Sequence, residues 1–408
     1  MLLIMAFFIL LMGTISNGQH LSGEKAAASE VKVYCYRSES LSKAKAEIKA
    51  KDPKFSKDLE RLRKQADKAL QSRPYSVMDK IRIPPSGDKH DYLSLAPYYW
   101  PDPSKNDGLP YIDRDGEVNP ESKIGTDSPM LERMCSEVDT LALAYYFTEN
   151  ESYAQHAALL LRTWFLDPGT HMNPHLEYAQ GMPGRNSGQP YGIIDTHVLI
   201  KVVDAVGLLE GCKAWTAKDQ EGMESWYDAF THWLRTSKHG IKESEADNNH
   251  GTWFAAQIAS FSLFVDKKEQ AQKILEGVKQ RIAYQIEIDG RQPLELKRTK
   301  SFSYSIFNLS ALFDLAEMGR KAGVDLYGYQ TKDGRSIKKA LDYLAPYMDP
   351  KRIWPYRDIN PRGRDWNTLV YLLRIGVLEY KDKVYDDLLS KFGRDVVPAH
   401  PLQLLFPQ

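Results

Sequence analysis

Apolar residues recur at helical spacing in segment after segment of this chain, from about residue 38 onward. The pattern is clearest in residues 128–147, where Ser128 and Pro129 are typical of a helix start and the following apolar residues share one face. Period-two alternation, which marks half-buried strands, is rare. The sequence therefore predicts an all-α protein built from about a dozen amphipathic helices. Further helical segments are 40–72 (interrupted at Pro53), 151–165, 199–206, 217–237, 251–265, 271–282, 306–316, 334–347, 365–377 and 384–392.

Short connections between most of these helices favour α-hairpins packed side by side. No repeat of about 34–47 residues is visible, which argues against a repeat solenoid. We expect one domain over residues 38–408, an incomplete or closed (α/α) toroid or barrel of helical hairpins with one rim of loops. Long loops inside a compact domain are usually functional, so this rim is the expected place of a site. The long loops are 84–127, 168–193, 239–250, 289–300 and 349–364.

The N-terminus reads as a targeting segment. Residues 2–12 form an uninterrupted apolar run, and small and polar residues follow up to Gly18. The run has the length of the apolar part of a secretion signal and is too short to span a bilayer, although no Lys or Arg precedes it. We expect residues 1–18 to be a cleaved secretion signal, with a membrane anchor as the alternative, and residues 19–37 to be a polar lead-in. After signal removal we expect no membrane contact.

The charge balance excludes some classes of partner. The chain has 54 Lys and Arg residues and 54 Asp and Glu residues, so its formal net charge is zero. This argues against an electrostatically driven nucleic-acid binder, and an anionic ligand would have to meet a local basic patch. The 3 Cys residues are too few and too scattered for a disulfide framework or a zinc cluster. We expect no metal in the site, no cofactor and no obligate protein partner.

Two segments carry residue types suited to acid–base chemistry. Asn249 and His250 lie at an expected helix start, where an amide offers donors and a neutral imidazole accepts a proton. The ordinary alternative is that Asn caps the helix. Arg298 and Tyr304 are six residues apart, so they converge only if Arg298 lies in a loop and Tyr304 in the following helix. The alternative is a core tyrosine beside a solvated basic loop.

Aromatic and proline residues are concentrated in residues 90–103 and 354–357. Proline stiffens such a loop, and an aromatic face can lie against the C–H face of a sugar. An aromatic plug over the core explains the same pattern. The short motifs of zinc proteases, serine hydrolases and nucleotide-binding proteins are absent from the chain.

Five segments in a fixed order resemble the alginate lyase family of α/α-toroid polysaccharide lyases. The most specific part is NNHGTW together with ELxRTxSFxY, and the resemblance covers most of residues 85–350. It implies a secreted bacterial enzyme that cleaves polyuronates such as alginate, poly-mannuronate, poly-guluronate or glucuronan. The segments are HDYLSLAPYYWPDP (90–103), GLPYIDRDGEVNP (108–120), YGIIDTHVLIKVVDAVGLL (191–209), NNHGTWFAAQ (248–257) and ELKRTKSFSYSIFNL (295–309).

Lyases of this kind act by β-elimination, which removes the C5 proton of a uronate and expels the glycosidic oxygen from C4. The substrate carboxylate must be neutralised, the proton removed and the leaving oxygen protonated. The resemblance implies that Asn249 and Arg298 neutralise the carboxylate and that Tyr304 acts at C5 and O4. It casts His250 as a second acid or base, or as a partner in neutralisation. In more distant members the arginine and the tyrosine are seven positions apart, a spacing that Lys297 would restore, but the ELxR motif favours Arg298.

Stereochemistry divides the roles by substrate. In mannuronate and glucuronate the C5 hydrogen and O4 lie on one face, so Tyr304 could make both transfers. In guluronate they lie on opposite faces, and we expect His250 as the base and Tyr304 as the acid. Tyrosine has an ordinary pKa of about 10, and we expect Arg298 and a hydrogen bond from His250 to favour the tyrosinate.

Further residues are candidates for binding the anionic polysaccharide. A basic groove is expected from Arg185, Lys297, Lys300, Arg352 and Arg357, and solvated loop charges are the alternative. Two rival functions remain at this point: a toroidal hydrolase of unsaturated uronides, and a non-catalytic helical glycan-binding protein. The substrate-binding candidates are Tyr99, Trp100, Arg185, Gln189, His197, Trp253, Lys297, Trp354 and Arg357.

Overall fold

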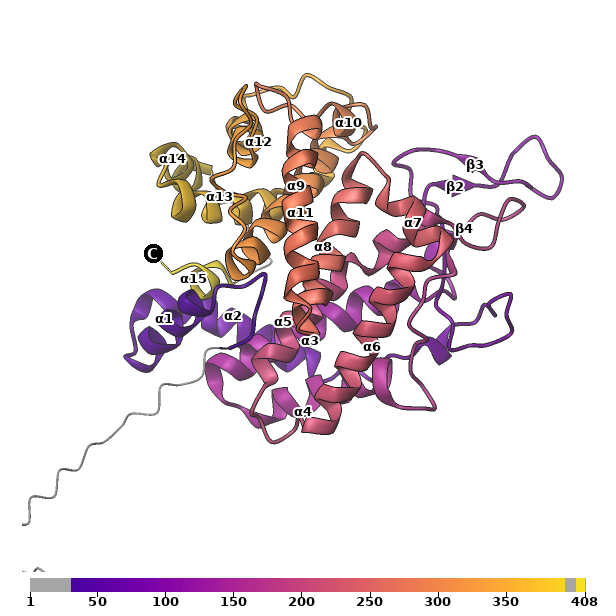
Figure 1. The fold of residues 1–408 in the computed structure, drawn as a ribbon, viewed down its shortest axis with the longest axis horizontal. Helices are drawn as coiled ribbons and strands as arrows, with labels where there is room; N and C mark the ends of the chain where they lie inside the picture. Colours follow the sequence, from indigo (N-terminus) through magenta and orange to yellow (C-terminus); the bar gives the residue numbers. More distant parts are fainter. Residues whose placement is uncertain (1–30, 393–400, 408) are drawn as a thin grey trace, which may run out of the picture. The chain divides into compact units, whose positions relative to one another are not determined.

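Helices dominate the computed structural model, which describes residues 31–392 and 401–407 (Figure 1). The expected secretion signal and residues 19–30 of the lead-in lie outside the described residues. The all-α prediction is confirmed. The helices are α1 (Ser38–Lys49), α2 (Pro53–Ala69), α3 (Ser128–Thr148), α4 (Glu151–Leu161), α5 (Leu199–Leu209), α6 (Ala217–Thr236), α7 (Lys238–Ser244), α8 (Asn249–Phe264), α9 (Lys268–Gln285), α10 (Pro293–Leu296), α11 (Ser301–Ala322), α12 (Ile337–Leu344), α13 (Trp366–Tyr380), α14 (Lys383–Phe392) and α15 (Leu402–Leu405).

The helices form an inner and an outer layer, as expected for an (α/α) toroid. Helices α3, α5, α8 and α11 contact one another in that order, and α8 and α11 are buried along most of their length. Outer helices cover them: α2 and α4 pack on α3, α6 and α9 on α8, and α12 on α11. An inner helix is covered on all sides, which explains why α8 lacks a polar face. The cluster of α8, α9 and α11 is visible in Figure 1.

The compact domain starts before residue 38, where the sequence had placed its boundary. Asp204 on α5 accepts hydrogen bonds from the backbone N–H groups of Tyr34, Cys35 and Tyr36, at 2.7–2.9 Å. A Cβ atom at Gly207 would lie 1.9 Å from the carbonyl oxygen of Lys32, so only glycine permits this approach. Residues 31–37 of the lead-in therefore belong to the compact unit.

The long loops hold short strands that periodicity did not reveal. Strand β1 (Leu93–Leu95) pairs in parallel with β4 (Tyr178–Gly181), and β2 (Tyr99–Trp100) pairs antiparallel with β3 (Ile112–Asp113). Strands of two to four residues are too short for an alternating pattern to be recognised. Figure 1 shows β2, β3 and β4 near α7, so two loops that are distant in sequence meet on one side of the helices.

Within the described residues, no helix combines the length and hydrophobicity needed to cross a lipid bilayer. No group of three or more His, Cys, Asp or Glu side chains in that part of the chain is arranged to hold a metal ion.

Candidate active site

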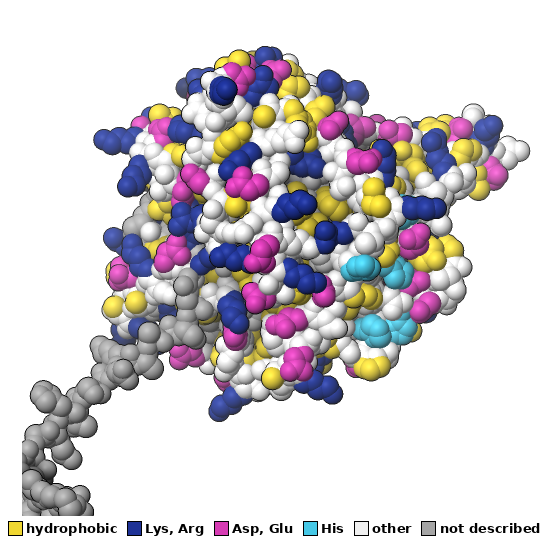
Figure 2. Space-filling view, in the orientation of Figure 1, with side chains coloured by type: hydrophobic (Ala, Val, Ile, Leu, Met, Phe, Trp, Pro, Cys, Tyr) yellow, Lys and Arg dark blue, Asp and Glu magenta, His cyan; other side chains and the backbone are white. Residues whose placement is uncertain are grey.

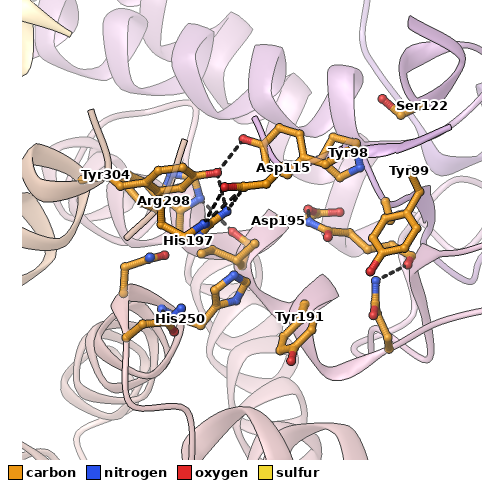
Figure 3. Close-up of a pocket in the computed structure, with 18 of the residues that line it drawn as sticks. Tyr98, Tyr99, Asp115, Ser122, Tyr191, Asp195, His197, His250, Arg298 and Tyr304 are labelled. Atoms are coloured by element: carbon orange, nitrogen blue, oxygen red, sulfur yellow. Dashed lines mark hydrogen bonds and ion pairs between the residues drawn. The ribbon is translucent and has the colours of Figure 1, made fainter. Parts of the chain in front are cut away.

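A cavity of about 820 Å³ opens where the long loops meet the N-terminal ends of α8 and α11 (Figure 3). Its walls come from the β1–β2 segment, from β4, and from the 3-10 segment Pro190–Val198 that leads into α5. The four residues to which the resemblance assigns catalytic roles all line it: Asn249, His250, Arg298 and Tyr304.

Arg298 and Tyr304 meet because Arg298 lies in the turn after α10 and Tyr304 in the first turn of α11. The guanidinium carbon of Arg298 lies 3.8 Å from the centroid of the Tyr304 ring, and Nη2 donates to the Tyr304 hydroxyl at 2.7 Å. The same hydroxyl donates to the hydroxyl of Tyr98 at 2.9 Å. The convergence that the six-residue spacing required is therefore present.

Asp115 holds Arg298 in this position. Nη2 of Arg298 donates to Oδ1 of Asp115 at 2.6 Å, and the backbone N–H of Thr299 donates to Oδ2 at 3.0 Å. Although burial raises the pKa of Asp115, the hydrogen bonds from Arg298 and Thr299 hold it below its ordinary value. Asp115 is therefore ionised at neutral pH and fixes the guanidinium over the tyrosine.

The protonation of Tyr304 differs from the expectation. Burial, and next the neighbouring Tyr98, raise the pKa of Tyr304 well above its ordinary value, and the opposing effect of Arg298 is smaller. Within the described residues no hydrogen bond joins His250 to Tyr304, and Nδ1 of His250 faces Glu243. In the free protein Tyr304 therefore keeps its proton at neutral pH.

Buried carboxylates also hold Asn249 and His250. Glu295 accepts from the backbone N–H of Asn249 at 2.8 Å and from its side-chain Nδ2 at 2.7 Å. Nδ1 of His250 lies 2.7 Å from Oε1 of Glu243, whose side chain is 1 % exposed. A carboxylate at Nδ1 favours the tautomer that leaves Nε2 as a proton acceptor. The helix cap is Asn248, whose side chain accepts from the His250 N–H, so Asn249 is not used as the cap.

The cavity is not the basic groove that was expected. None of the five predicted basic residues lines it, and Lys297, Arg352 and Arg357 are exposed outside it. On the face shown in Figure 2, Lys and Arg side chains are interspersed with Asp and Glu side chains. The charged residues that do line the cavity, His apart, are Lys123 and Arg298 with Asp113, Asp115, Glu132, Asp195 and Asp247.

Three of the substrate-binding candidates line the cavity: Tyr99, Gln189 and His197. His197 packs edge-on against Trp253 and Phe307, and its Nδ1 lies 2.8 Å from the carbonyl oxygen of Ile194. Burial lowers the pKa of His197, which is therefore neutral at pH 7. It offers an uncharged surface at the wall of the cavity.

The other substrate-binding candidates do not line the cavity, and their contact with a longer polymer stays a prediction. Trp253 and Trp354 are core residues, 4 % and 6 % exposed. Trp100 donates from Nε1 to the carbonyl oxygen of Glu117, outside the cavity. Arg185 is exposed, with its guanidinium carbon 5.7 Å from the centroid of the Tyr99 ring. Trp253 packs as core because its helix, α8, is an inner helix covered by its neighbours. Lys297 and Arg357 are exposed.

Sequence reasoning missed the residues that hold the site together. Tyr98 and Asp115 lie within segments that carried the resemblance, and Glu295 begins the ELxR motif. Membership of these motifs could have identified all three as site residues. Glu243 had no such signal, because it lies in α7, within a segment for which the sequence predicts a loop.

Comparison with known proteins defines the class. The family model described as alginate lyase matches residues 76–354. A crystal structure titled as an alginate lyase from Bacteroides ovatus is 39 % identical, with a TM-score of 0.87 over 92 % of this chain and 99 % of that one. The protein is a polysaccharide lyase with an (α/α)-toroid fold. It belongs to the alginate lyase family, which decides against both rival functions.

More distant structures share the fold. Alginate lyase A1-III from Sphingomonas species A1 is 18 % identical, with a TM-score of 0.55 over 86 % of this chain and 94 % of that one. A tyrosine-to-phenylalanine variant of A1-III complexed with a tetrasaccharide has a TM-score of 0.59 at 18 % identity, over 93 % of this chain and 97 % of that one. No curated protein matched the sequence.

Proposed function

We propose that this lyase cleaves a polyuronate, of the alginate or glucuronan type, by β-elimination in the cavity described above. The observation that carries the proposal is the placement of the Arg298 guanidinium on the Tyr304 ring and hydroxyl, in one cavity with Asn249 and His250. The relatives are named alginate lyases, and one is complexed with a tetrasaccharide. Residues 1–18 would direct the enzyme to the periplasm or the exterior of a bacterium.

Neutralisation of the substrate carboxylate falls to Arg298 and Asn249. Nε and Nη2 of Arg298 donate to Asp115, and Nη2 also donates to Tyr304. Nη1 of Arg298 is left for a ligand. Glu295 takes one N–H of the Asn249 amide, and the second remains. A substrate carboxylate bound between these donors would keep both hydrogen bonds while negative charge builds up on it in the enolate-like transition state.

Proton transfer is divided between His250 and Tyr304. Because Tyr304 keeps its proton, it is suited to protonate O4 of the leaving sugar. His250, oriented by Glu243, presents Nε2 as the base for the C5 proton. This pair of groups supports the anti elimination of guluronate directly. The syn elimination of mannuronate or glucuronate requires Tyr304 to lose its proton to solvent first, after which the hydroxyl of Tyr98 can donate a hydrogen bond to the tyrosinate.

Tyr99, Gln189 and His197 are proposed to contact the polymer, since they line the same cavity. The test is the rise in absorbance at 235 nm from the unsaturated product, measured with separate poly-mannuronate, poly-guluronate and glucuronan samples. Activity on at least one polyuronate is expected. Absence of product with all of them, from folded protein, would contradict the proposed function.

A further inference from the structure

Gln180 has an unusual backbone conformation inside the cavity wall. Its φ is +48°, in the left-handed region that a residue with a Cβ adopts only at a cost. The other described non-glycine residues with positive φ each follow the end of a helix, where this conformation is common. They are Lys51, Glu149, Asp266 and Lys381.

A β-bulge accompanies this conformation. Leu93 pairs with Tyr178 and Leu95 with Gly181. An advance of two residues along β1 is therefore matched by three residues along β4. Bulges re-aim a side chain and are frequent next to active sites. A strained residue that the surrounding structure holds in place is likewise typical of functional sites.

Neighbouring side chains fix Gln180 at both backbone groups. Its N–H donates to Oγ of Ser94 at 2.7 Å, and its carbonyl accepts from Nε2 of Gln189 at 2.8 Å. Its own Nε2 donates to Oδ1 of Asp195 at 2.7 Å. Asp195 is held in turn by the hydroxyls of Ser94 and Tyr92. The bond to this carboxylate also defines which end of the amide is nitrogen.

The rest of the amide is unused. No described residue donates to Oε1 of Gln180, and one N–H of Nε2 remains, while Gln180 lines the cavity. Figure 3 shows Tyr99 and Tyr191 at the end of the cavity where Asp195 lies, away from Tyr304 and Arg298. A donor beside an acceptor matches two adjacent sugar hydroxyls, whereas the free oxygen and Asp195 would repel a carboxylate.

We propose that Gln180 determines specificity by binding the adjacent hydroxyl pair of the sugar that neighbours the one being cleaved. This proposal rests on the proposed polyuronate lyase function. The carboxylate of that neighbouring sugar then points away from the wall formed by Gln180 and Asp195. The alternative is that Gln180 only shapes β4.

Substitution by glycine separates the two roles. Glycine adopts positive φ freely, so Gln180→Gly removes the backbone strain together with the amide. A residue that only supplied this backbone conformation would therefore be replaced without loss of activity. Lys381→Gly is the matched control, since Lys381 also has positive φ (+50°), is exposed and lies after α13. Gln180→Asn provides a second variant, because asparagine tolerates this conformation and withdraws the amide by one methylene.

We expect Gln180→Gly and Gln180→Asn to fold, with a Tm within a few degrees of the wild-type value or above it. Their kcat/KM on an unmodified polyuronate should fall about tenfold or more, mainly through KM, because binding to a neighbouring sugar is shared by ground and transition states. Lys381→Gly should keep wild-type kinetics. Activity of both Gln180 variants within twofold of the wild type would overturn the proposal.

A second substrate identifies the hydroxyls. Acetylation of O2 and O3 on the same polymer blocks the pair, so the wild type should prefer the unmodified polymer. In Gln180→Gly this preference should decrease by about the same factor as kcat/KM on the unmodified polymer. An unchanged preference would overturn hydroxyl recognition by Gln180. A wild-type enzyme inactive on every polyuronate would instead overturn the proposed function and this proposal with it.

Discussion

Replacement of Glu243 by glutamine tests the role of His250 through a residue that cannot touch the substrate. Glu243 is buried, and its Oε1 lies 2.7 Å from Nδ1 of His250. Glutamine keeps the size and one hydrogen bond but removes the charge. When His250 takes the C5 proton, the resulting imidazolium loses its counter-ion in the variant.

The magnitude follows from the distance. Opposite charges centred about 4 Å apart interact by about 4 kcal/mol at an effective dielectric constant of about 20. The amide retains a hydrogen bond and water offsets part of the loss, so we take about 2–3 kcal/mol in the transition state. This corresponds to a decrease in kcat/KM of about 10²-fold on poly-guluronate.

The assay compares kcat/KM on poly-guluronate, poly-mannuronate and glucuronan. Since Tyr304 can make both transfers in a syn elimination, the loss on the other two polymers should be at most a few-fold. Substitution of His250 by alanine should give the same pattern, and the double variant should lose little more than His250→Ala alone. Glu177→Gln is the control, because it removes an exposed carboxylate that lies 3.8 Å from His239 and outside the cavity.

Two results would refute this reasoning. Wild-type activity of Glu243→Gln on poly-guluronate would exclude His250 as a base that depends on Glu243. Equal losses on all three polymers would leave His250 as a shared neutraliser of the carboxylate.

Four further outcomes are expected. Tyr304→Phe should lose at least about 10²–10⁴-fold in kcat and stay folded, while the control Tyr343→Phe, outside the cavity, should not; activity within a few-fold of wild type would remove Tyr304 from the mechanism. Arg298→Ala should lower mainly kcat, and a rise in KM alone would make it an ordinary binding residue. Because the pKa of Tyr304 is raised, this acid stays protonated and the alkaline limb of kcat/KM should lie above about pH 10; a fall centred near pH 8 would contradict that role. Asp204→Asn should destabilise the fold by about 2–3 kcal/mol in urea unfolding, since an amide cannot accept all three N–H groups of residues 34–36, and an unchanged midpoint would contradict this.

The helical part of the fold was predictable because its signals are local. Proline at the first position of α2 and the capping box of Thr216 and Asp219 at α6 mark helix starts within a few residues. The strands of the long loops gave no such signal, since each is only two to four residues long. The compact unit also begins earlier than residue 38, because residues 34–37 are held by hydrogen bonds to Asp204 and Glu317, far along the chain.

The cavity was predictable in its motif residues and not in their environment. The six-residue spacing allowed Arg298 to meet Tyr304, and the structure brings them into contact. The spacing did not reveal that burial would raise the pKa of Tyr304 more than Arg298 lowers it, so that Tyr304 stays protonated. Nor did it reveal that acids rather than the predicted basic residues line the wall.

The sequence by itself determined the helices, their order and the residues that carry the resemblance, because periodicity and short motifs are properties of neighbouring residues. Only the tertiary structure decided which carboxylate holds each of these groups. Asp115 is 183 residues from Arg298, and Glu295 is 46 residues from Asn249. Contacts over such separations depend on how the loops pack against the inner helices. No local pattern in the chain encodes them.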